Sequence, residues 1–319
     1  MIERELLNNI RKNLFKGKAI LLFGARQTGK TTLVNEIVRE YGNSCLMLNA
    51  DEPDIRLRLN NATSTELKNL IGNAKLLIID EAQRIINSGL TLKLITDNLK
   101  DVQLIATGSS AFELADKIKE SLTGRCWEYN LFPFSIVELT NHFGALEESR
   151  LLENRLIYGF YPEVINHPGN EKQILNSITD SILFKDLYAL EKVKKPATLE
   201  KLLQALSLQA GNEVSYSELS QIIEADKETV ERYIYLLEKS FIVFRLYALS
   251  RNVRNELKRS RKIYFYDNGI RNSIIANFSP LDIRSDKGAL WENFLVAERM
   301  KLTHYNNYYC KKYFWRESR

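Results

Sequence analysis

The stretch AILLFGARQTGKTTLVNEIV, residues 19–38, constrains the fold of this chain more than any other. Five apolar residues enter a loop with two glycines, a lysine and two threonines, and the residues after it have the apolar spacing of a helix. Residues 24–31 match the pattern G-x-x-x-x-G-K-[ST]. Glycine lets the backbone turn tightly, so that successive N–H groups point inward at phosphate oxygens. A buried strand, a phosphate-binding loop and a helix are predicted.

The side chains of this loop fit a nucleoside triphosphate with Mg²⁺. Lys30 can bridge the β- and γ-phosphates, and the hydroxyl of Thr31 can ligate the metal. Thr32 is expected near the α-phosphate. The helix that begins near Gly29 adds the positive end of its dipole.

A second apolar run, KLLIIDEAQR at residues 75–84, ends in two acids. A parallel strand here places Asp80 at its carboxyl end beside the phosphate loop, where it can hold Mg²⁺ through water. Glu81 follows directly and can polarise or position an attacking water, a task that P-loop enzymes require. The pair therefore predicts hydrolysis as well as binding.

A third strand is predicted in VQLIATGSS, residues 102–110, and it ends in small hydroxyl residues. Its carboxyl end faces the same nucleotide, so Thr107, Ser109 or Ser110 is expected to contact the γ-phosphate or the water. Ser109 can alternatively cap the helix that follows. Arg125 precedes the next strand and can stabilise transition-state charge on the nucleotide of a neighbouring subunit.

Other phosphate-loop classes fit less well. A GTPase needs an Asn-Lys-x-Asp base reader, whereas NLKD at residues 98–101 has the wrong order and precedes a strand. A small-molecule kinase needs an arginine-rich lid and has no Asp-Glu pair at a strand end. The pattern favours an ATPase.

Five segments, GARQTGKTT, LLIIDEAQR, ATGSSAFEL, LTGR and LFPFSIVEL, together resemble the AAA+ superfamily. The closer resemblance is to prokaryotic ATP-binding proteins in which an AAA domain precedes an uncharacterised carboxyl-terminal domain. The features specific to that group are Gln27-Thr28, Gln83-Arg84, the segment L-x-P-x-S-x-x-E-L at residues 131–139 and GFYPEV at residues 159–164. The resemblance covers essentially the whole chain.

The resemblance implies an α/β P-loop NTPase of the AAA+ type, with a parallel sheet core, a helical lid, a winged helix-turn-helix and a partial α/β segment at the carboxyl end. It assigns Mg²⁺ and water to Asp80 and Glu81, γ-phosphate sensing to the Ser109 region, and a finger role to Arg125. The residues that it assigns to ATP are Gly24, Ala25, Arg26, Gln27, Thr28, Gly29, Lys30, Thr31 and Thr32. Lys30, Glu81 and Arg125 are the expected catalytic residues.

Four parts are expected along the chain: an ATPase core (1–145), a helical lid or linker (146–195), a winged helix-turn-helix (196–267) and the incomplete start of a nuclease-like domain (268–319). Pro196 breaks the chain at the second boundary. The winged unit is predicted from helix, helix, helix and strand in succession.

Double-stranded DNA is a candidate partner of residues 227–262, because basic residues gather at 245–262 and can neutralise phosphates. Glu228 and Glu231 on the third helix argue against strong reading of bases, and a solvated hairpin is the competing interpretation. The nuclease-like segment offers Glu292 without the further acidic pair that metal-dependent cleavage needs. Its strand-like aromatic end favours a truncated form of a longer product that does not cut nucleic acid.

Composition sets the remaining bounds. The 319 residues are 45% hydrophobic and 27% charged with net charge +5, and no run of 18 apolar residues occurs, so no membrane span is expected. Three widely spaced cysteines indicate free thiols and a cytoplasmic protein. The predicted function is Mg²⁺-dependent ATP hydrolysis coupled to movement of the carboxyl-terminal module. The alternative is an ATP-gated DNA-binding switch with little turnover, and a homo-oligomer is a further possibility.

Overall fold

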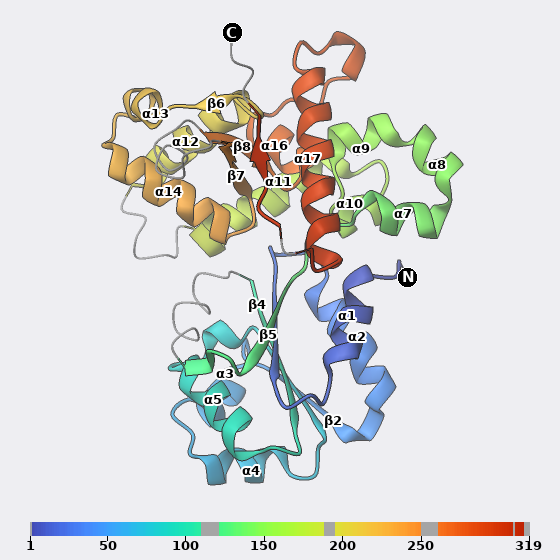
Figure 1. The fold of residues 1–319 in the computed structure, drawn as a ribbon, viewed down its shortest axis with the longest axis vertical. Coiled ribbons are helices and arrows are strands. Elements are labelled where there is room, and N and C mark those ends of the chain that lie inside the picture. The colour runs from blue at the N-terminus through green and yellow to red at the C-terminus, as the bar shows by residue number, and fades with distance from the viewer. Residues whose placement is uncertain (1, 110–120, 188–194, 250–260, 309, 316–319) are drawn as a thin grey trace. The chain divides into compact units, whose positions relative to one another are not determined.

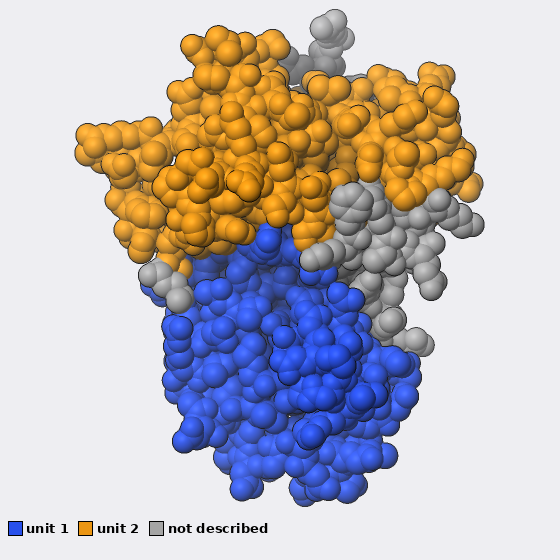
Figure 2. Space-filling view, turned by 180° about the vertical axis from the view of Figure 1, so that it is seen from behind, with its two compact units in different colours: residues 1, 3–131 blue, residues 2, 132–319 orange. Residues whose placement is uncertain are grey.

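The computed structural model describes residues 2–109, 121–187, 195–249, 261–308 and 310–315. Contacts divide the chain into two compact units (Figure 2): unit 1 holds residues 3–131, and unit 2 holds residues 132–319 together with Ile2. Each unit has its own sheet. Over the described ranges, no helix combines the length and the apolar composition needed to cross a membrane.

Unit 1 is built on a five-stranded sheet in the order β2-β3-β4-β1-β5, with every neighbouring pair parallel. The strands are β1 (Ala19–Phe23), β2 (Cys45–Asn49), β3 (Leu76–Asp80), β4 (Gln103–Gly108) and β5 (Cys126–Asn130). All residues of β1, β3 and β4 are buried. Central strands of a parallel sheet are covered on both faces, which explains their unbroken apolar runs. The predicted α/β fold is confirmed.

Helices cover both faces of this sheet. Figure 1 shows α1 and α2 on one side, and α3, α4 and α5 on the other. Right-handed crossovers require this division, since the chain moves from β1 out to β2 and then returns through β3 to β4. The helices of unit 1 are α1 (Glu5–Asn13), α2 (Lys30–Tyr41), α3 (Pro53–Leu59), α4 (Ser64–Ile71) and α5 (Ser88–Asn98), with 3₁₀ turns η1 (Gly42–Ser44) and η2 (Ala82–Arg84).

The strand register aligns the carboxyl ends of the strands. Phe23 in β1 pairs with Gly108 in β4, and Asn49 in β2 pairs with Asp80 in β3. The loops after β1, β3 and β4 therefore all leave the sheet at the carboxyl ends of its strands. In open α/β sheets, ligands bind at these carboxyl ends.

Unit 2 begins with a group of helices. They are α7 (Ile136–Phe143), α8 (Ala145–Arg150), α9 (Leu152–Tyr158), α10 (Pro162–Asn166) and α11 (Glu171–Ser181), followed by the π-helical turn η3 (Ile182–Leu187). Ser135 and Glu138 form a capping box at the start of α7, which accounts physically for the Ser and Glu of the L-x-P-x-S-x-x-E-L segment.

The rest of unit 2 surrounds a second sheet in the order β6-β8-β7-β9, in which β6, β8 and β7 are antiparallel and β9 is parallel to β7. Its elements are α12 (Pro196–Leu208), β6 (Glu213–Val214), α13 (Tyr216–Ile222), α14 (Lys227–Lys239), β7 (Val243–Ala248), β8 (Arg261–Phe265), α16 (Asn268–Ile274), η4 (Leu281–Ile283), α17 (Lys287–Tyr305) and β9 (Tyr313–Phe314). The apolar face predicted for α14 is buried.

Charged side chains fasten α17 within unit 2. The buried Lys301 ammonium donates to the carbonyl oxygen of Phe134 at 2.9 Å and to Glu298 at 2.7 Å. Glu298 in turn accepts a hydrogen bond from the Ile136 N–H at 2.7 Å. Glu292, singled out from the sequence, accepts from Lys262 at 2.9 Å and from the Tyr264 hydroxyl at 2.7 Å.

Candidate active site

The loop between β1 and α2 has the backbone that its glycines predict. Gly29 is the N-cap residue of α2, with φ 92°. Gly24 has no room for a side chain, since an added Cβ would lie 2.3 Å from the carbonyl oxygen of Leu131. Gln27 also has positive φ, at 59°. The loop is thus a tight turn packed against the end of β5.

Lys30 points into this loop. Its side chain is buried, and its ammonium donates to the carbonyl oxygens of Gly24 and Ala25, both at 2.9 Å. The Thr28 hydroxyl donates to Ala25 as well, at 2.9 Å. Because carbonyl oxygens are neutral acceptors, phosphate oxygens at the same place would bind the ammonium more strongly.

Asp80 lies beside the loop, as the second strand predicts. Its carboxylate accepts from the Thr31 hydroxyl at 2.9 Å and also from the Thr107 hydroxyl. The Asp80 side chain is only 4% exposed, and within the described residues it forms no ion pair. A buried carboxylate without a cationic partner is costly, so the site favours a cation.

Glu81 takes a left-handed backbone conformation, with φ 54° and ψ 41°. Its N–H donates to the Thr107 hydroxyl oxygen at 3.1 Å, which ties the turn to the end of β4. Its carboxylate accepts from the amide of Gln83, and the same amide nitrogen lies 3.1 Å from Ser109 Oγ. The ends of β3 and β4 are therefore joined by one hydrogen-bonded network, which the bond between Thr31 and Asp80 extends to the first turn of α2.

The remaining predicted site residues differ in their exposure. Thr32 is exposed on the first turn of α2, and Arg26 is half-buried in the loop. Ser109 is buried at the end of β4, while Ser110 and the helix predicted after it lie outside the described residues.

Arg125 lies at the opposite end of the sheet from the loop. Its carbonyl oxygen accepts from the N–H of Ala19, the first residue of β1. Its guanidinium pairs with Asp97 at 2.9 Å. The geometry therefore separates Arg125 from the nucleotide site of its own chain, and only a site on another copy remains for the finger role.

The described residues of the basic segment are engaged by carboxylates. Arg245 pairs with Glu238 on α14, Arg261 lies 3.8 Å from Glu231, and Lys262 binds Glu292. The other basic residues of the 245–262 segment, Arg251, Arg254, Lys258 and Arg259, lie outside the described residues.

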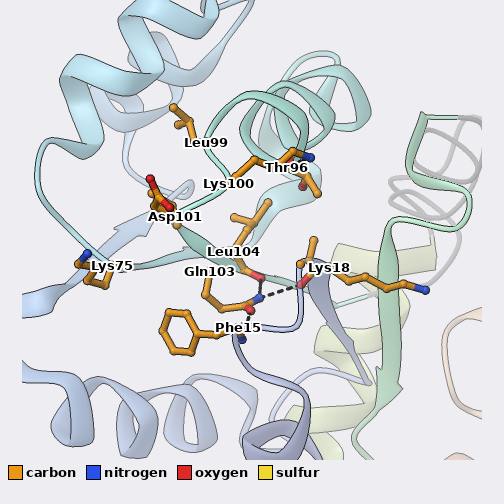
Figure 3. Close-up of a pocket in the computed structure, with 12 residues that line it drawn as sticks. Phe15, Lys18, Lys75, Thr96, Leu99, Lys100, Asp101, Gln103 and Leu104 are labelled. Carbon is orange, nitrogen blue, oxygen red and sulfur yellow. Dashed lines mark hydrogen bonds between the residues drawn. The ribbon is translucent and has the colours of Figure 1, made fainter.

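A hollow of about 330 Å³ in unit 1 lies at the amino ends of the strands, where β1 and β4 begin. Figure 3 shows its lining: Gln103 donates to the Lys18 carbonyl at 3.0 Å and accepts from the Phe15 N–H at 2.6 Å. The Lys18 side chain runs away from the other labelled residues, and its ammonium lies 4.5 Å from the centre of the Trp127 ring. The hollow is separate from the network around Asp80.

Two features of the site were not assigned from the sequence. Gln83 was noted only as part of a motif, because nothing in a linear pattern shows that its amide reaches both Glu81 and Ser109. The contact between Gly24 and Leu131 joins segments more than one hundred residues apart. Only the register of β5 beside β1 reveals it.

Comparisons with known families agree with this geometry. Residues 16–140 match an AAA domain, and residues 149–282 match a domain of unknown function (DUF8612). Uncharacterised proteins of Mycobacterium bovis and Mycobacterium tuberculosis are each 27% identical over 318 residues, which cover 98% of this chain and 68% of the relative. An uncharacterised protein of Methanocaldococcus jannaschii is 27% identical over 78% of this chain and 61% of its own length.

Among solved structures, one chain of Drosophila ORC bound to AT-rich DNA and Cdc6 covers 85% of this chain and 92% of its own, at 14% identity and a TM-score of 0.29. A likeness this weak carries no inference. The AAA match, by contrast, spans the range that holds all five strands of the parallel sheet and the loop after β1. Residues 16–140 match an AAA domain, and their five-stranded parallel sheet has the α/β fold of a P-loop NTPase.

Proposed function

We propose that the chain binds Mg·ATP at residues 24–32 and hydrolyses it with Glu81 as the residue that positions and polarises water. One observation carries the proposal: Thr31, Asp80, Thr107 and Glu81 form a continuous hydrogen-bonded chain beside the loop that holds Lys30. A structural turn does not need a buried carboxylate that forms no ion pair with the described residues.

The oxygen donors at this place fit Mg²⁺. A carboxylate and a hydroxyl are the hard ligands that this ion prefers, and Mg²⁺ normally completes its shell with water and phosphate oxygens. Thr31 and Asp80 would hold it, and when bound it neutralises charge that develops on the phosphates. The pairing of Thr31 with Asp80 at 2.9 Å places both donors together.

Each residue then has a defined task in hydrolysis. The loop amides and the Lys30 ammonium bind the β- and γ-phosphates and fix their orientation. The Glu81 carboxylate accepts a hydrogen bond, and then a proton, from the water whose oxygen forms the new bond to phosphorus. The bond to the bridging oxygen breaks, and ADP leaves with its electron pair. The Ser109 hydroxyl donates to a γ-phosphate oxygen.

The test uses two substitutions in purified protein. Lys30→Ala removes the cation in the loop and is expected to abolish ATP binding measured by calorimetry. Glu81→Gln keeps the shape of the side chain and is expected to retain ATP binding but to stop phosphate release. Lys75→Ala is the matched control, because Lys75 is exposed just before β3, at the far end of the sheet. ATP hydrolysis by Glu81→Gln at the wild-type rate would remove the assigned role.

We also propose roles for the residues that follow the ATPase domain. Residues 146–195 act as a lid or linker, and residues 196–267 as a winged helix-turn-helix. The succession α12, β6, α13, α14, β7, β8 with an antiparallel β6-β8-β7 sheet supports the winged assignment. Nucleotide state moves this module relative to the ATPase domain. Residues 268–319 open an α/β segment in which Glu292 is held by Lys262.

The alternative, an ATP-gated DNA switch, gains no support from the described residues, because Arg245, Arg261 and Lys262 are each engaged by a glutamate. Its test is DNA affinity against salt concentration, with and without ATP; a slope near zero removes it. Arg125→Ala tests for a homo-oligomer in which Arg125 contacts the nucleotide of a neighbouring copy. The substitution would then lower ATP turnover only at protein concentrations at which the oligomer forms.

A further inference from the structure

Gln83 connects two groups that hydrolysis requires. It lies in the 3₁₀ turn after β3, and its side chain is only 7% exposed. Its amide nitrogen donates to the Glu81 carboxylate and to Ser109 Oγ, the latter at 3.1 Å. A primary amide has two N–H donors, so both are used.

The carbonyl oxygen of the same amide has no hydrogen-bond partner among the described residues, although it is buried. An unpaired buried acceptor costs about 1–3 kcal/mol, so such groups normally bind water or a ligand. This oxygen shares a carbon atom with the nitrogen that binds Glu81 and Ser109. A water bound to this oxygen would therefore lie near the Glu81 carboxylate and Ser109.

The backbone supports this arrangement. Glu81 occupies the left-handed region at φ 54°, a conformation that costs a non-glycine residue about 1–2 kcal/mol. The turn is held by the bond from Glu81 N–H to Thr107 and by the bond from Arg84 N–H to the Glu81 carbonyl at 2.9 Å. The reversal returns Gln83 to the end of β4, where its amide meets Ser109. Strain of this kind concentrates at functional sites.

We propose that Gln83 is a positioning residue for ATP hydrolysis: its amide N–H groups hold the Glu81 carboxylate against Ser109, and its carbonyl oxygen accepts a hydrogen bond from the attacking water. The inference rests on the proposed function. The water then donates one proton toward Glu81 and the other toward Gln83, which directs its lone pair at the γ-phosphorus. Because Ser109 Oγ accepts from Gln83, its own proton is left to donate to the phosphate.

The test compares two substitutions at Gln83. Gln83→Met keeps nearly the same side-chain volume but removes the hydrogen bonds of the amide. Gln83→Ala removes the hydrogen bonds and most of the side-chain volume. We expect either one to lower kcat about 10- to 100-fold, with KM and ATP affinity changed by less than about twofold. Arg84→Ala is the control in the same turn, since that side chain is exposed and its ion pair within the described part of the chain is with Asp51, at 3.3 Å.

A second measurement separates positioning from packing. In the Glu81→Gln background, Gln83→Met is expected to leave ATP affinity within about twofold and to cause no further loss of whatever slow phosphate release remains in single-turnover assays, because the two residues act as a unit. A wild-type kcat in Gln83→Met overturns the inference. So does a loss of kcat in Gln83→Ala that follows the folded fraction and is absent in Gln83→Met. Absence of turnover in the wild type overturns the proposed function as well, so the two failures are distinguishable.

Discussion

Gly24→Ala places a methyl group where the structure leaves no room for one. The added Cβ would lie 2.3 Å from the Leu131 carbonyl oxygen, whereas an ordinary van der Waals contact has a separation of about 3.5 Å. The two backbones must therefore part by about 1 Å. They are joined by the hydrogen bond from Leu131 N–H to the Phe23 carbonyl at 2.7 Å, which opposes the movement.

The expected consequences follow from that displacement. Overpacking costs typically about 1–3 kcal/mol of unfolding free energy, so the domain stays folded but less stable. A shift of about 1 Å in a group that orients substrate lowers turnover about 100-fold. Urea unfolding measures the loss of unfolding free energy. Steady-state phosphate release, together with ATP affinity, measures the loss of turnover.

Gly17→Ala provides the matched control. Gly17 has positive φ, at 72°, but an added Cβ would meet nothing within 4 Å. The substitution carries only the left-handed strain of about 1–2 kcal/mol and should leave ATP turnover unchanged. If Gly24→Ala retains wild-type turnover, or if Gly17→Ala loses as much activity, the steric reasoning about the loop is refuted.

Three further predictions concern other contacts. Thr31→Ala removes the hydroxyl beside Asp80 and should raise the Mg²⁺ concentration needed for half-maximal turnover at least about tenfold, measured by Mg²⁺ titration; an unchanged requirement contradicts the metal assignment. Ser135→Ala deletes the α7 cap and should lower the unfolding free energy by about 1 kcal/mol in urea, with Thr140→Ala as a helix control. Burial, with a smaller effect of the Lys312 charge, lowers the pKa of His304 to about 4. The folded state therefore resists protonation, and stability present above about pH 6.5 falls as the pH approaches 4, by up to about 3 kcal/mol. His304→Gln should flatten that loss in pH-dependent unfolding, and an equal slope in both proteins would contradict it.

The parts of the fold that could be predicted were those with local causes. The loop after Phe23, the strand that ends at Asp80 and the strand that ends near Gly108 each combine an apolar run with residues whose chemistry is specific to a strand end. Parallel strands then bring those ends together without further information. For that reason Thr31 and Asp80 lie within hydrogen-bond distance of one another.

The rest depends on contacts that no local pattern contains. The left-handed conformation of Glu81 is unusual for that residue type, so the reversal that directs Gln83 back to Ser109 was not visible in DEAQR. Arg125 lies at the far end of the sheet, so its predicted role on the nucleotide of a neighbouring subunit depends on an assembly that no local pattern contains. The basic cluster at residues 245–262 suggested a surface able to meet DNA phosphates, whereas glutamates on α14 and α17 engage its described members.

The most direct test of the account is a crystal structure of the protein with Mg²⁺ and a non-hydrolysable ATP analogue. The account predicts the triphosphate inside residues 24–32, the metal between Thr31 and Asp80, and an ordered water in contact with both Glu81 and Gln83. A nucleotide bound elsewhere, or a γ-phosphate remote from Asp80 and Glu81, would contradict it.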